Sequence, residues 1–389
     1  MKARSILLTM LASICGMSLW FVSAAALPGM VAEFALSPGQ QAALSSGVQG
    51  GFVIGALALA ISGLPDRLDP RAVFAACSVA AALANTALLI VPLDGPLAVA
   101  LRVVTGAMLA GVYPVGMKIA VGWGSTDRGL LVGALVGAVS LGSASPHLLS
   151  LLGGADWRGT VMLASVLSGF GGLLVLVAKL GPHHVRAPAF NPNAIKTAWT
   201  NRGVRLAIVG YLGHMWELYA MWAWIGAITA ASFALVMPGD EAARLATFAA
   251  FFIIAIGGVM CVPCGWLADR VGKAQVAGGA MVVSGLAAVL AAITFGGPIW
   301  LVLPVLLIWG ASVIPDSPQL SALVADHAPA EQTGSLLTFQ TALGFGLTLL
   351  TVQAAPILAE SWGWRPVLII MALGPVVGVW AMRRLIRMP

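Results

Sequence analysis

The sequence predicts an all-α membrane protein with twelve transmembrane helices, arranged as two six-helix halves with the N and C termini in the cytoplasm. Three observations lead to this fold class. Hydrophobic residues make up 60% of the 389 residues and charged residues only 9%, whereas a typical soluble domain carries about 25% charge. Apolar runs long enough to cross a bilayer recur along the whole chain. Several residue patterns also repeat about 200 residues apart, which indicates a duplicated unit.

Each expected span is long enough for the roughly 20 residues that a helix needs to cross a bilayer. Helices satisfy their own backbone groups, as hydrocarbon requires. The first run follows Lys2 and Arg4, so a signal peptide is an alternative there, but its length and the eleven similar runs favour a retained span. The expected spans are 5–31, 41–63, 72–93, 97–121, 129–152, 158–180, 203–235, 244–267, 274–295, 299–324, 333–355 and 365–385.

The basic residues set the orientation, because cytoplasmic segments of membrane proteins carry an excess of Lys and Arg. With both termini inside, fifteen of the 20 basic residues fall in inside segments. Only Arg158, Arg244 and Arg365 fall outside, while Arg102 and Lys118 lie within a span. We therefore expect an even number of spans and a multi-pass protein of the cell inner membrane.

An internal repeat divides the chain. We expect an N-terminal six-helix half over 1–180, a cytoplasmic linker over 181–202 and a C-terminal six-helix half over 203–389. Two similar halves can rock about a central site that faces each side in turn. The recurring pairs are Asp66-Arg67 with Asp269-Arg270, Pro114 with Pro315, Trp157-Arg158 with Trp364-Arg365, and Gly129 with Gly334.

The segment 265–273, between the eighth and ninth spans, reads GWLADRVGK. It resembles the cytoplasmic signature loop G-x-L-x-D-R-x-G-R/K of the major facilitator superfamily (MFS). The first-half copy, 62–71, reads SGLPDRLDPR and departs from the pattern, because Ser62 and Asp69 stand where glycines are expected. Two further segments fit: the run from Arg102 resembles the family's R-x-x-x-G motif, and 133–146 resembles its glycine-rich helix that ends in proline. The resemblance covers essentially the whole chain and implies that spans one, four, seven and ten line a central cavity.

The signature loops are candidates for a gating role. An aspartate there can accept from the N-terminus of a neighbouring helix, and an arginine can pair with an acid on another helix. Contacts that form in one state and break in the other would bias the two populations. A plain cytoplasmic anchor is the alternative. The candidate gating residues are Asp66, Arg67, Arg71, Asp269, Arg270 and Lys273.

Polar side chains inside the spans point to a central site, because ionisable groups in a membrane are costly and usually functional. His214 and Glu217 are three apart in span seven and share a helix face. Asp316 in span ten lies between two prolines, which would loosen the helix and free carbonyl groups. In span four, Arg102 and Tyr113 are eleven residues apart, about three helical turns, and share a face. The expected cavity residues are Trp20, Arg102, Tyr113, Tyr211, His214, Glu217, Trp309 and Asp316.

Glu217, Asp316 and His214 are the candidate proton carriers. A carboxyl group in a low-dielectric site takes up a proton more readily than it does in water, and histidine titrates near neutral pH. The alternative is a static role: a buried ion pair, for example Glu217 with His214, or Asp316 as the cap of a broken helix. For Arg102 two roles stay open: binding an anionic substrate, or a structural or gating role.

These features predict a secondary active transporter that moves a small polar or anionic organic solute by alternating access, coupled to protons. The alternatives are a drug or toxin exporter, an uncoupled facilitator and, from Cys261 and Cys264, a transporter of a soft metal such as copper. No phosphate-binding glycine loop and no hydrolase motif appears in the sequence, so we expect neither an ATP-driven pump nor an enzyme. The expected partners are a small-molecule substrate, the proton and the lipid bilayer, with no cofactor, no metal, no nucleic acid and a monomeric chain.

Overall fold

A computed structural model describes the chain except for residues 125–127, 153–155, 185–190, 193 and 389. The side chains of 65, 66, 128, 129 and 330 also lie outside the description, and these include Asp66, one of the expected gating residues. Within the described part, all the regular elements are helices. The first nine α-helices are α1 Lys2–Met17, α2 Val22–Phe34, α3 Pro38–Ser62, α4 Leu64–Arg67, α5 Pro70–Thr86, α6 Pro96–Leu109, α7 Tyr113–Val121, α8 Arg128–Leu152 and α9 Trp157–Val175, with a short 3-10 helix, η1, over Ala87–Ile90. The remaining ones are α10 Ala194–Thr200, α11 Arg202–Phe233, α12 Gly239–Val271, α13 Lys273–Thr294, α14 Ile299–Val313, α15 Ser317–His327, α16 Thr333–Trp362, α17 Trp364–Met371 and α18 Leu373–Ile386, with η2 over Ala330–Gln332.

Eleven segments of the described chain are long and apolar enough to cross a membrane. They coincide with eleven of the twelve expected spans. The twelfth expected span, 203–235, coincides with α11, a helix of 32 residues that carries His214 and Glu217. These polar side chains lower the mean hydropathy of the central part of α11.

Four spans are interrupted rather than continuous. The first is broken at 18–21 between α1 and α2, the fourth at 110–112 between α6 and α7, the tenth at 314–316 between α14 and α15, and the twelfth at Ala372 between α17 and α18. Prolines occupy the first turn of α7 and of α15, and proline lacks the N–H that would continue a helix. The breaks leave carbonyl groups available to side chains from other helices.

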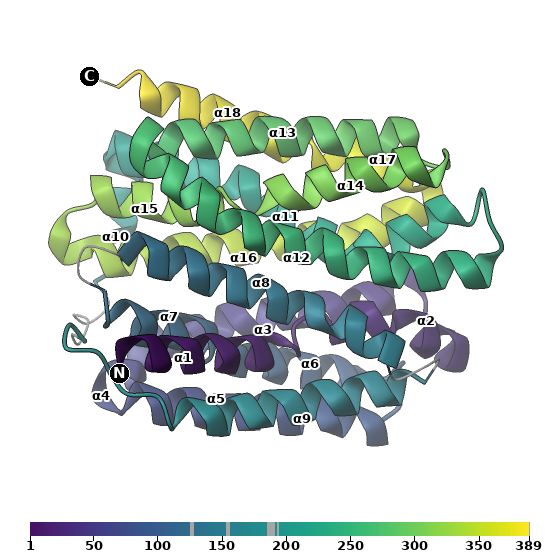
Figure 1. Cartoon of the computed structure of the whole chain (residues 1–389), viewed down its shortest axis with the longest axis horizontal. Coiled ribbons are helices and arrows are strands. Elements are labelled where there is room, and N and C mark those ends of the chain that lie inside the picture. The colour runs from purple at the N-terminus through teal and green to yellow at the C-terminus, as the bar shows by residue number, and fades with distance from the viewer. Residues whose placement is uncertain (125–127, 153–155, 185–190, 193, 389) are drawn as a thin grey trace.

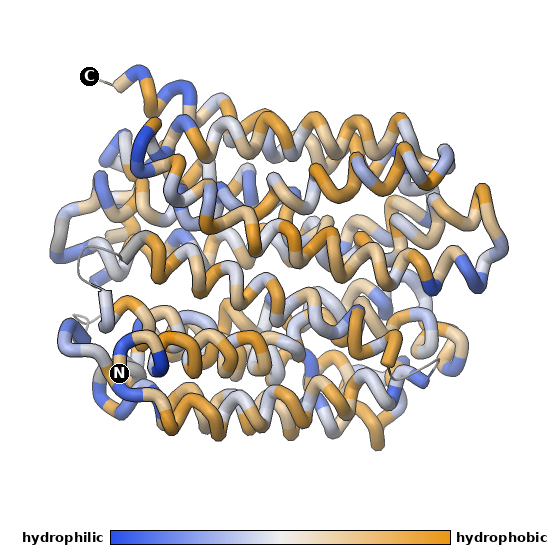
Figure 2. Tube along the Cα trace, in the orientation of Figure 1, coloured by the Kyte–Doolittle hydropathy of each residue, from blue (hydrophilic) through white to orange (hydrophobic). Residues whose placement is uncertain are grey.

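The helices lie side by side, and both chain termini lie at the same end of the bundle (Figure 1). We call this end the termini end and the opposite one the far end. Most of α1–α9 lie in the lower part of this view and α11–α18 in the upper part, while α8 and α12 meet between them. Hydrophilic residues gather at the two ends and hydrophobic ones along the middle (Figure 2), as expected for helices that cross a bilayer.

Glycines set how closely the helices approach. A Cβ atom at Gly51 on α3 would collide with the backbone of Val103 on α6, and one at Gly106 on α6 would collide with that of Val48. Between α8 and α12, a Cβ at Gly137 would lie 2.8 Å from the carbonyl oxygen of Gly258. Small residues at such crossings are what allow close packing where lipid gives no hydrophobic drive.

Candidate functional site

A cavity of about 530 Å³ lies between α3, α7, α8, α15 and α16. Its wall includes Lys118, three residues before the end of α7, and Ala325, two before the end of α15. Leu337, four residues after the beginning of α16, also lines it. All three positions are near helix ends that lie at the termini end, so the cavity occupies that half of the bundle.

An aromatic cluster lies next to the cavity, on the side that points to the far end of the bundle. Trp20, Phe52, Tyr219 and Phe345 form it, with ring centroids 5.0 Å apart for Trp20 and Phe52, 4.4 Å for Phe52 and Phe345, and 4.9 Å for Tyr219 and Phe345. Thr341, one helical turn before Phe345, lines the cavity. The cluster therefore joins helices from both parts of the chain between the cavity and the far end.

Hydrogen bonds between α3 and α16 continue this closed region toward the far end. Ser46 Oγ donates to Gln353 Oε1 at 2.9 Å, and Gln353 Nε2 donates to the carbonyl oxygen of Gly39 at 3.3 Å. Gly39 belongs to the first turn of α3. α3 and α16 are thus in contact from the aromatic cluster to the far end.

His214 and Asp316 form a buried pair next to the cavity. His214 Nδ1 lies 2.8 Å from Asp316 Oδ1, and the side chains are 1% and 2% exposed. Asp316 occupies the break between α14 and α15, and the next two residues, Ser317 and Pro318, line the cavity. The ring of Tyr211 lies 5.9 Å from that of His214. The break thus brings a carboxylate from one span to an imidazole of another.

Glu217 lies on the same helix but has different partners. Trp309 Nε1 donates to its Oε1 at 2.7 Å, and Ser284 Oγ donates to its Oε2 at 2.8 Å. All three side chains are buried. His214 and Glu217 share a helix face but do not pair with each other; each meets a different helix.

Arg102 is fully buried, and its guanidinium donates four hydrogen bonds. Its Nη1 donates to Asn85 Oδ1 at 2.9 Å, and its Nη2 donates to the carbonyl oxygens of Leu19 and Trp20 at 3.1 and 3.0 Å. Its Nε donates to the carbonyl oxygen of Leu44 at 3.3 Å. The carbonyls of Leu19 and Trp20 belong to the break between α1 and α2, so Arg102 satisfies backbone groups that the interrupted helix leaves unpaired.

The expected cavity residues therefore separate into groups. Tyr113 lines the cavity itself. His214, Asp316 and Tyr211 lie next to one another behind the cavity wall. Glu217 and Trp309 are joined by a hydrogen bond from the indole N–H to the carboxylate. Trp20 belongs to the aromatic cluster. Arg102 lies apart from Tyr113, because the break at 110–112 ends the continuous helix that would place both on one face.

Sequence reasoning missed several polar positions. Ser284 is a lone hydroxyl in an apolar stretch of α13, and that isolation is a signal that could have singled it out. Lys118 lines the cavity, whereas its position near a span end suggests a simple interfacial anchor. Gln340, next to the cavity-lining Thr341, is buried, and its amide has no hydrogen-bond partner in the described part.

The second-half signature loop lies between α12 and α13. Gly272 adopts φ +105° between the two helices, a backbone conformation that favours glycine. The guanidinium of Arg270 lies 3.4 Å from the ring centroid of Trp266, and Lys273 Nζ forms an ion pair with Asp326 at the end of α15. Asp269 is exposed. Lys273 is therefore the loop residue that contacts the tenth span.

The first-half signature loop lacks the two glycines that the pattern expects at 62 and 69, and Gly63 and Asp69 form its turns. Gly63 takes the left-handed conformation at the end of α3. Asp69 caps α5 by accepting from the backbone N–H of Arg71 at 2.9 Å, and it pairs with the Arg71 guanidinium at 2.6 Å. Arg71 also donates to the carbonyl oxygen of Ala178 at 3.0 Å. The hydrogen bonds from the Arg71 side chain hold the pKa of Asp69 below its ordinary value. Arg67 is exposed at the end of α4.

Cys261 and Cys264 are free thiols. Within the described residues, no three His, Cys, Asp or Glu side chains gather as a metal site would require. Cys261 Sγ instead donates to the carbonyl oxygen of Gly257, one turn earlier in α12.

Comparison with known proteins agrees with this architecture. Among solved structures, the chain is similar to a mutant of the nucleoside transporter NupG, with a TM-score of 0.72 and 14% identity over 98% of this chain and 100% of that one. It is also similar to a D-xylose-proton symporter, with a TM-score of 0.75 and 15% identity over 100% and 98%. A third similar structure is FucP, a Major Facilitator Superfamily transporter in the outward conformation, with a TM-score of 0.66 and 14% identity over 96% and 98%. At these identities the likeness shows the fold alone.

Sequence comparison identifies the family and gives no match to an individual curated protein. No curated protein matches the chain. The family model of the Major Facilitator Superfamily matches residues 9–352, nearly the whole chain. This multi-pass membrane protein therefore belongs to the major facilitator superfamily and is a transporter of that class.

Proposed function

We propose that this transporter moves a small polar or anionic organic solute across the cell inner membrane and couples the movement to protons through Glu217 and Asp316. One observation carries the proposal: both carboxyl groups are buried, Asp316 next to the cavity-lining Ser317 and Glu217 between α11, α13 and α14, and no Lys or Arg pairs with either in the described part. A buried carboxylate without a cationic partner is costly. Proton uptake during one stage of the cycle removes that cost, and proton release when access changes would couple the two movements.

The same geometry supports alternating access. If α11 is the twelfth span, an even number of crossings would put both termini on one side, and the excess of basic residues favours the cytoplasm for that side. The cavity at the termini end then faces inward. The halves over 1–180 and 203–389 would rock about it, joined by the linker over 181–202, in a chain that works as a monomer. In this state Asp269 forms no ion pair within the described residues, as expected of a gating contact that is made in the opposite state.

A polar solute fits the groups around the cavity. Among the described lining residues Lys118 is the charged one, and Ser317, Ser321 and Thr341 supply hydroxyl groups. The unpaired amide of Gln340 lies next in sequence to this wall. A pocket of this kind fixes its ligand with a few placed polar groups on a largely apolar wall.

The test is transport by purified protein in liposomes under an imposed pH gradient. Replacing Glu217 with Gln should abolish concentrative uptake while counterflow exchange continues, because exchange needs no net proton movement. Glu241→Gln, an exposed acid in the first turn of α12, is the matched control and should transport as the wild type does. Unchanged accumulation by Glu217→Gln and by Asp316→Asn would show that neither acid carries the proton. A wild type that only equilibrates the solute under the same pH gradient would be an uncoupled facilitator and would refute proton coupling.

A drug exporter is a second candidate, favoured by the apolar part of the cavity wall. Ala56, Leu59, Met117, Val132 and Val136 belong to that part, and such a wall accepts amphipathic molecules with little selectivity. Cells that express the transporter would then survive several unrelated toxins, and saturable uptake of a single acid would be absent.

A further inference from the structure

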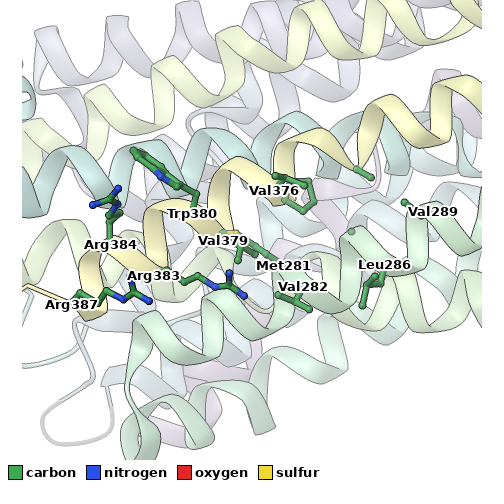
Figure 3. Close-up of a pocket in the computed structure, with 13 residues that line it drawn as sticks. Met281, Val282, Leu286, Val289, Val376, Val379, Trp380, Arg383, Arg384 and Arg387 are labelled. Atoms are coloured by element: carbon green, nitrogen blue, oxygen red, sulfur yellow. The ribbon is translucent and has the colours of Figure 1, made fainter.

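A long apolar groove lies on the outer surface of the bundle, separate from the cavity. It runs between α13 and the α17–α18 span and has a volume of about 620 Å³. Leu286 and Val289 lie toward one end, and Arg383, Arg384 and Arg387 lie at the other (Figure 3). The transport mechanism proposed above makes no use of this groove.

Close packing of small residues produces the groove. A Cβ atom at Gly285 on α13 would lie 2.9 Å from Pro375 Cβ, and one at Gly378 on α18 would collide with the Met281 sulfur. The backbones therefore approach closely, and larger side chains stand on either side of the contact. Leu286 is 59% exposed and Val376 is 65% exposed, so both face the lipid.

The basic end of the groove is not neutralised by the protein. Arg383, Arg384 and Arg387 are exposed on the last turn of α18 and the residue after it. Within the described residues no carboxylate pairs with any of them; the nearby Lys273, by contrast, has Asp326 as its partner. Arg384 lies 5.9 Å from the ring centroid of Trp380. Three cations at the end of an apolar channel are complementary to a molecule with an anionic head and an apolar tail.

The dimensions fit one leaflet of a bilayer. The 14 residues of α18 extend about 21 Å at 1.5 Å per residue, compared with about 15 Å for half of the hydrocarbon core. The three arginines lie at the termini end, at the depth of the lipid phosphate groups of the leaflet on that side. Guanidinium groups bind phosphate through two parallel hydrogen bonds. We propose that the groove binds one anionic phospholipid of this leaflet, with an acyl chain along Leu286 and Val376 and the phosphate on the three arginines.

The first experiment tests the head group. Native mass spectrometry of the full chain measures retention of phosphatidylglycerol and of zwitterionic phosphatidylcholine, with no transported solute present. We expect the wild type to prefer phosphatidylglycerol, and Arg383→Gln/Arg384→Gln/Arg387→Gln to weaken that binding about tenfold or more, because basic side chains near a membrane surface attract anionic head groups. Arg4→Gln/Lys196→Gln/Arg202→Gln removes three exposed basic residues elsewhere and should bind as the wild type does. Equal retention of the two lipids, or equal loss in both triple variants, would overturn the proposal.

The second experiment tests the acyl chain. Leu286→Trp fills the groove from an exposed position, whereas Val283→Trp places the same ring on α13 at a position that is 44% exposed and does not line the groove. Phosphatidylglycerol should be lost from the first variant and kept by the second. Unchanged binding by Leu286→Trp would overturn the proposal, as would a lipid-independent dimer that Leu286→Trp dissociates, because the groove would then be a contact between copies of the chain. Neither measurement depends on proton coupling.

Discussion

At the scale of single residues, Arg102 shows how a buried charge is used for structure. Its guanidinium donates to Asn85 and to carbonyl groups of three other residues, and its side chain is 0% exposed. The carbonyl groups of Leu19 and Trp20 lie in the break between α1 and α2 and would otherwise be buried without a donor, and an unmade hydrogen bond of this kind costs about 1–3 kcal/mol. The geometry favours the structural role for this arginine over solute binding.

Replacing Arg102 with Lys should therefore destabilise the protein by about 3 kcal/mol, because an ammonium group cannot reproduce the planar fork. Thermal unfolding of the purified protein in detergent measures this loss. Asn85→Ala, which removes one acceptor, should cost less. If Arg102→Lys unfolds as the wild type does but raises the KM for the solute, the arginine contacts substrate and the structural role is wrong.

The His214–Asp316 pair shows what residue spacing could and could not predict. The periodicity of span seven placed His214 and Glu217 on one face, and both side chains are buried. The partners could not be predicted, because they come from α13, α14 and the break before α15. Spacing along one helix determines which side chains share a face; the packing of other helices decides what each one meets.

At the scale of elements, the turn between α3 and α5 shows how one acid substitutes for a glycine. Asp69 caps α5 and pairs with Arg71. Asp69→Ala should lower stability by about 1 kcal/mol, the usual cost of losing an N-cap. Asp69→Asn keeps the cap and loses only a largely exposed ion pair, so it should cost less. Thermal unfolding of both variants measures the difference, and equal losses would contradict the capping role.

The pH dependence of this turn follows from the same contact. Arg71 lowers the pKa of Asp69 from the ordinary 3.8, so the folded state favours the carboxylate form. Its contribution is complete above pH 3.8 and is lost as the pH falls through the lowered pKa. Wild type and Asp69→Asn should therefore approach equal stability in acid.

Helix breaks were predictable only where proline marks them. Pro114 and Pro315 indicate the interruptions of spans four and ten, and each lies at or beside a break in the structure. The break at 18–21 in span one contains no proline. There Arg102 takes the carbonyl groups of Leu19 and Trp20, a tertiary contact that no local pattern reveals.

At the scale of the whole molecule, the aromatic cluster and the α3–α16 contacts close the far end. Phe345→Ala removes the ring that contacts Phe52, Trp20 and Tyr219, and Gln353→Ala removes the hydrogen bonds to Ser46 and Gly39. Either change should loosen this closure and shift the population toward a state open at the far end.

A cysteine at the cavity-lining position Ser321, in a background without native cysteines, reports the change. An impermeant thiol reagent added at the far end should label Ser321→Cys slowly in the wild type and several-fold faster in the two variants. Phe252→Ala, a lipid-facing ring that is 45% exposed, is the control and should label slowly. Fast labelling of the wild type from the far end would show that the cluster is no barrier.

The two sides of the aromatic cluster differ in how firmly they are anchored. Trp20 sits in a break whose carbonyls are fixed by Arg102, and Phe52 follows Gly51, where α3 and α6 are in backbone contact. Next to Phe345, a Cβ at Gly344 would meet the side chains of Tyr211 and Met215 on α11, so α16 and α11 contact each other there through side chains and not through backbone. Trp20 and Phe52 would therefore stay in place while Tyr219 and Phe345 move away from them. The motion that exposes the solute to the exterior would be a movement of α11 and α16.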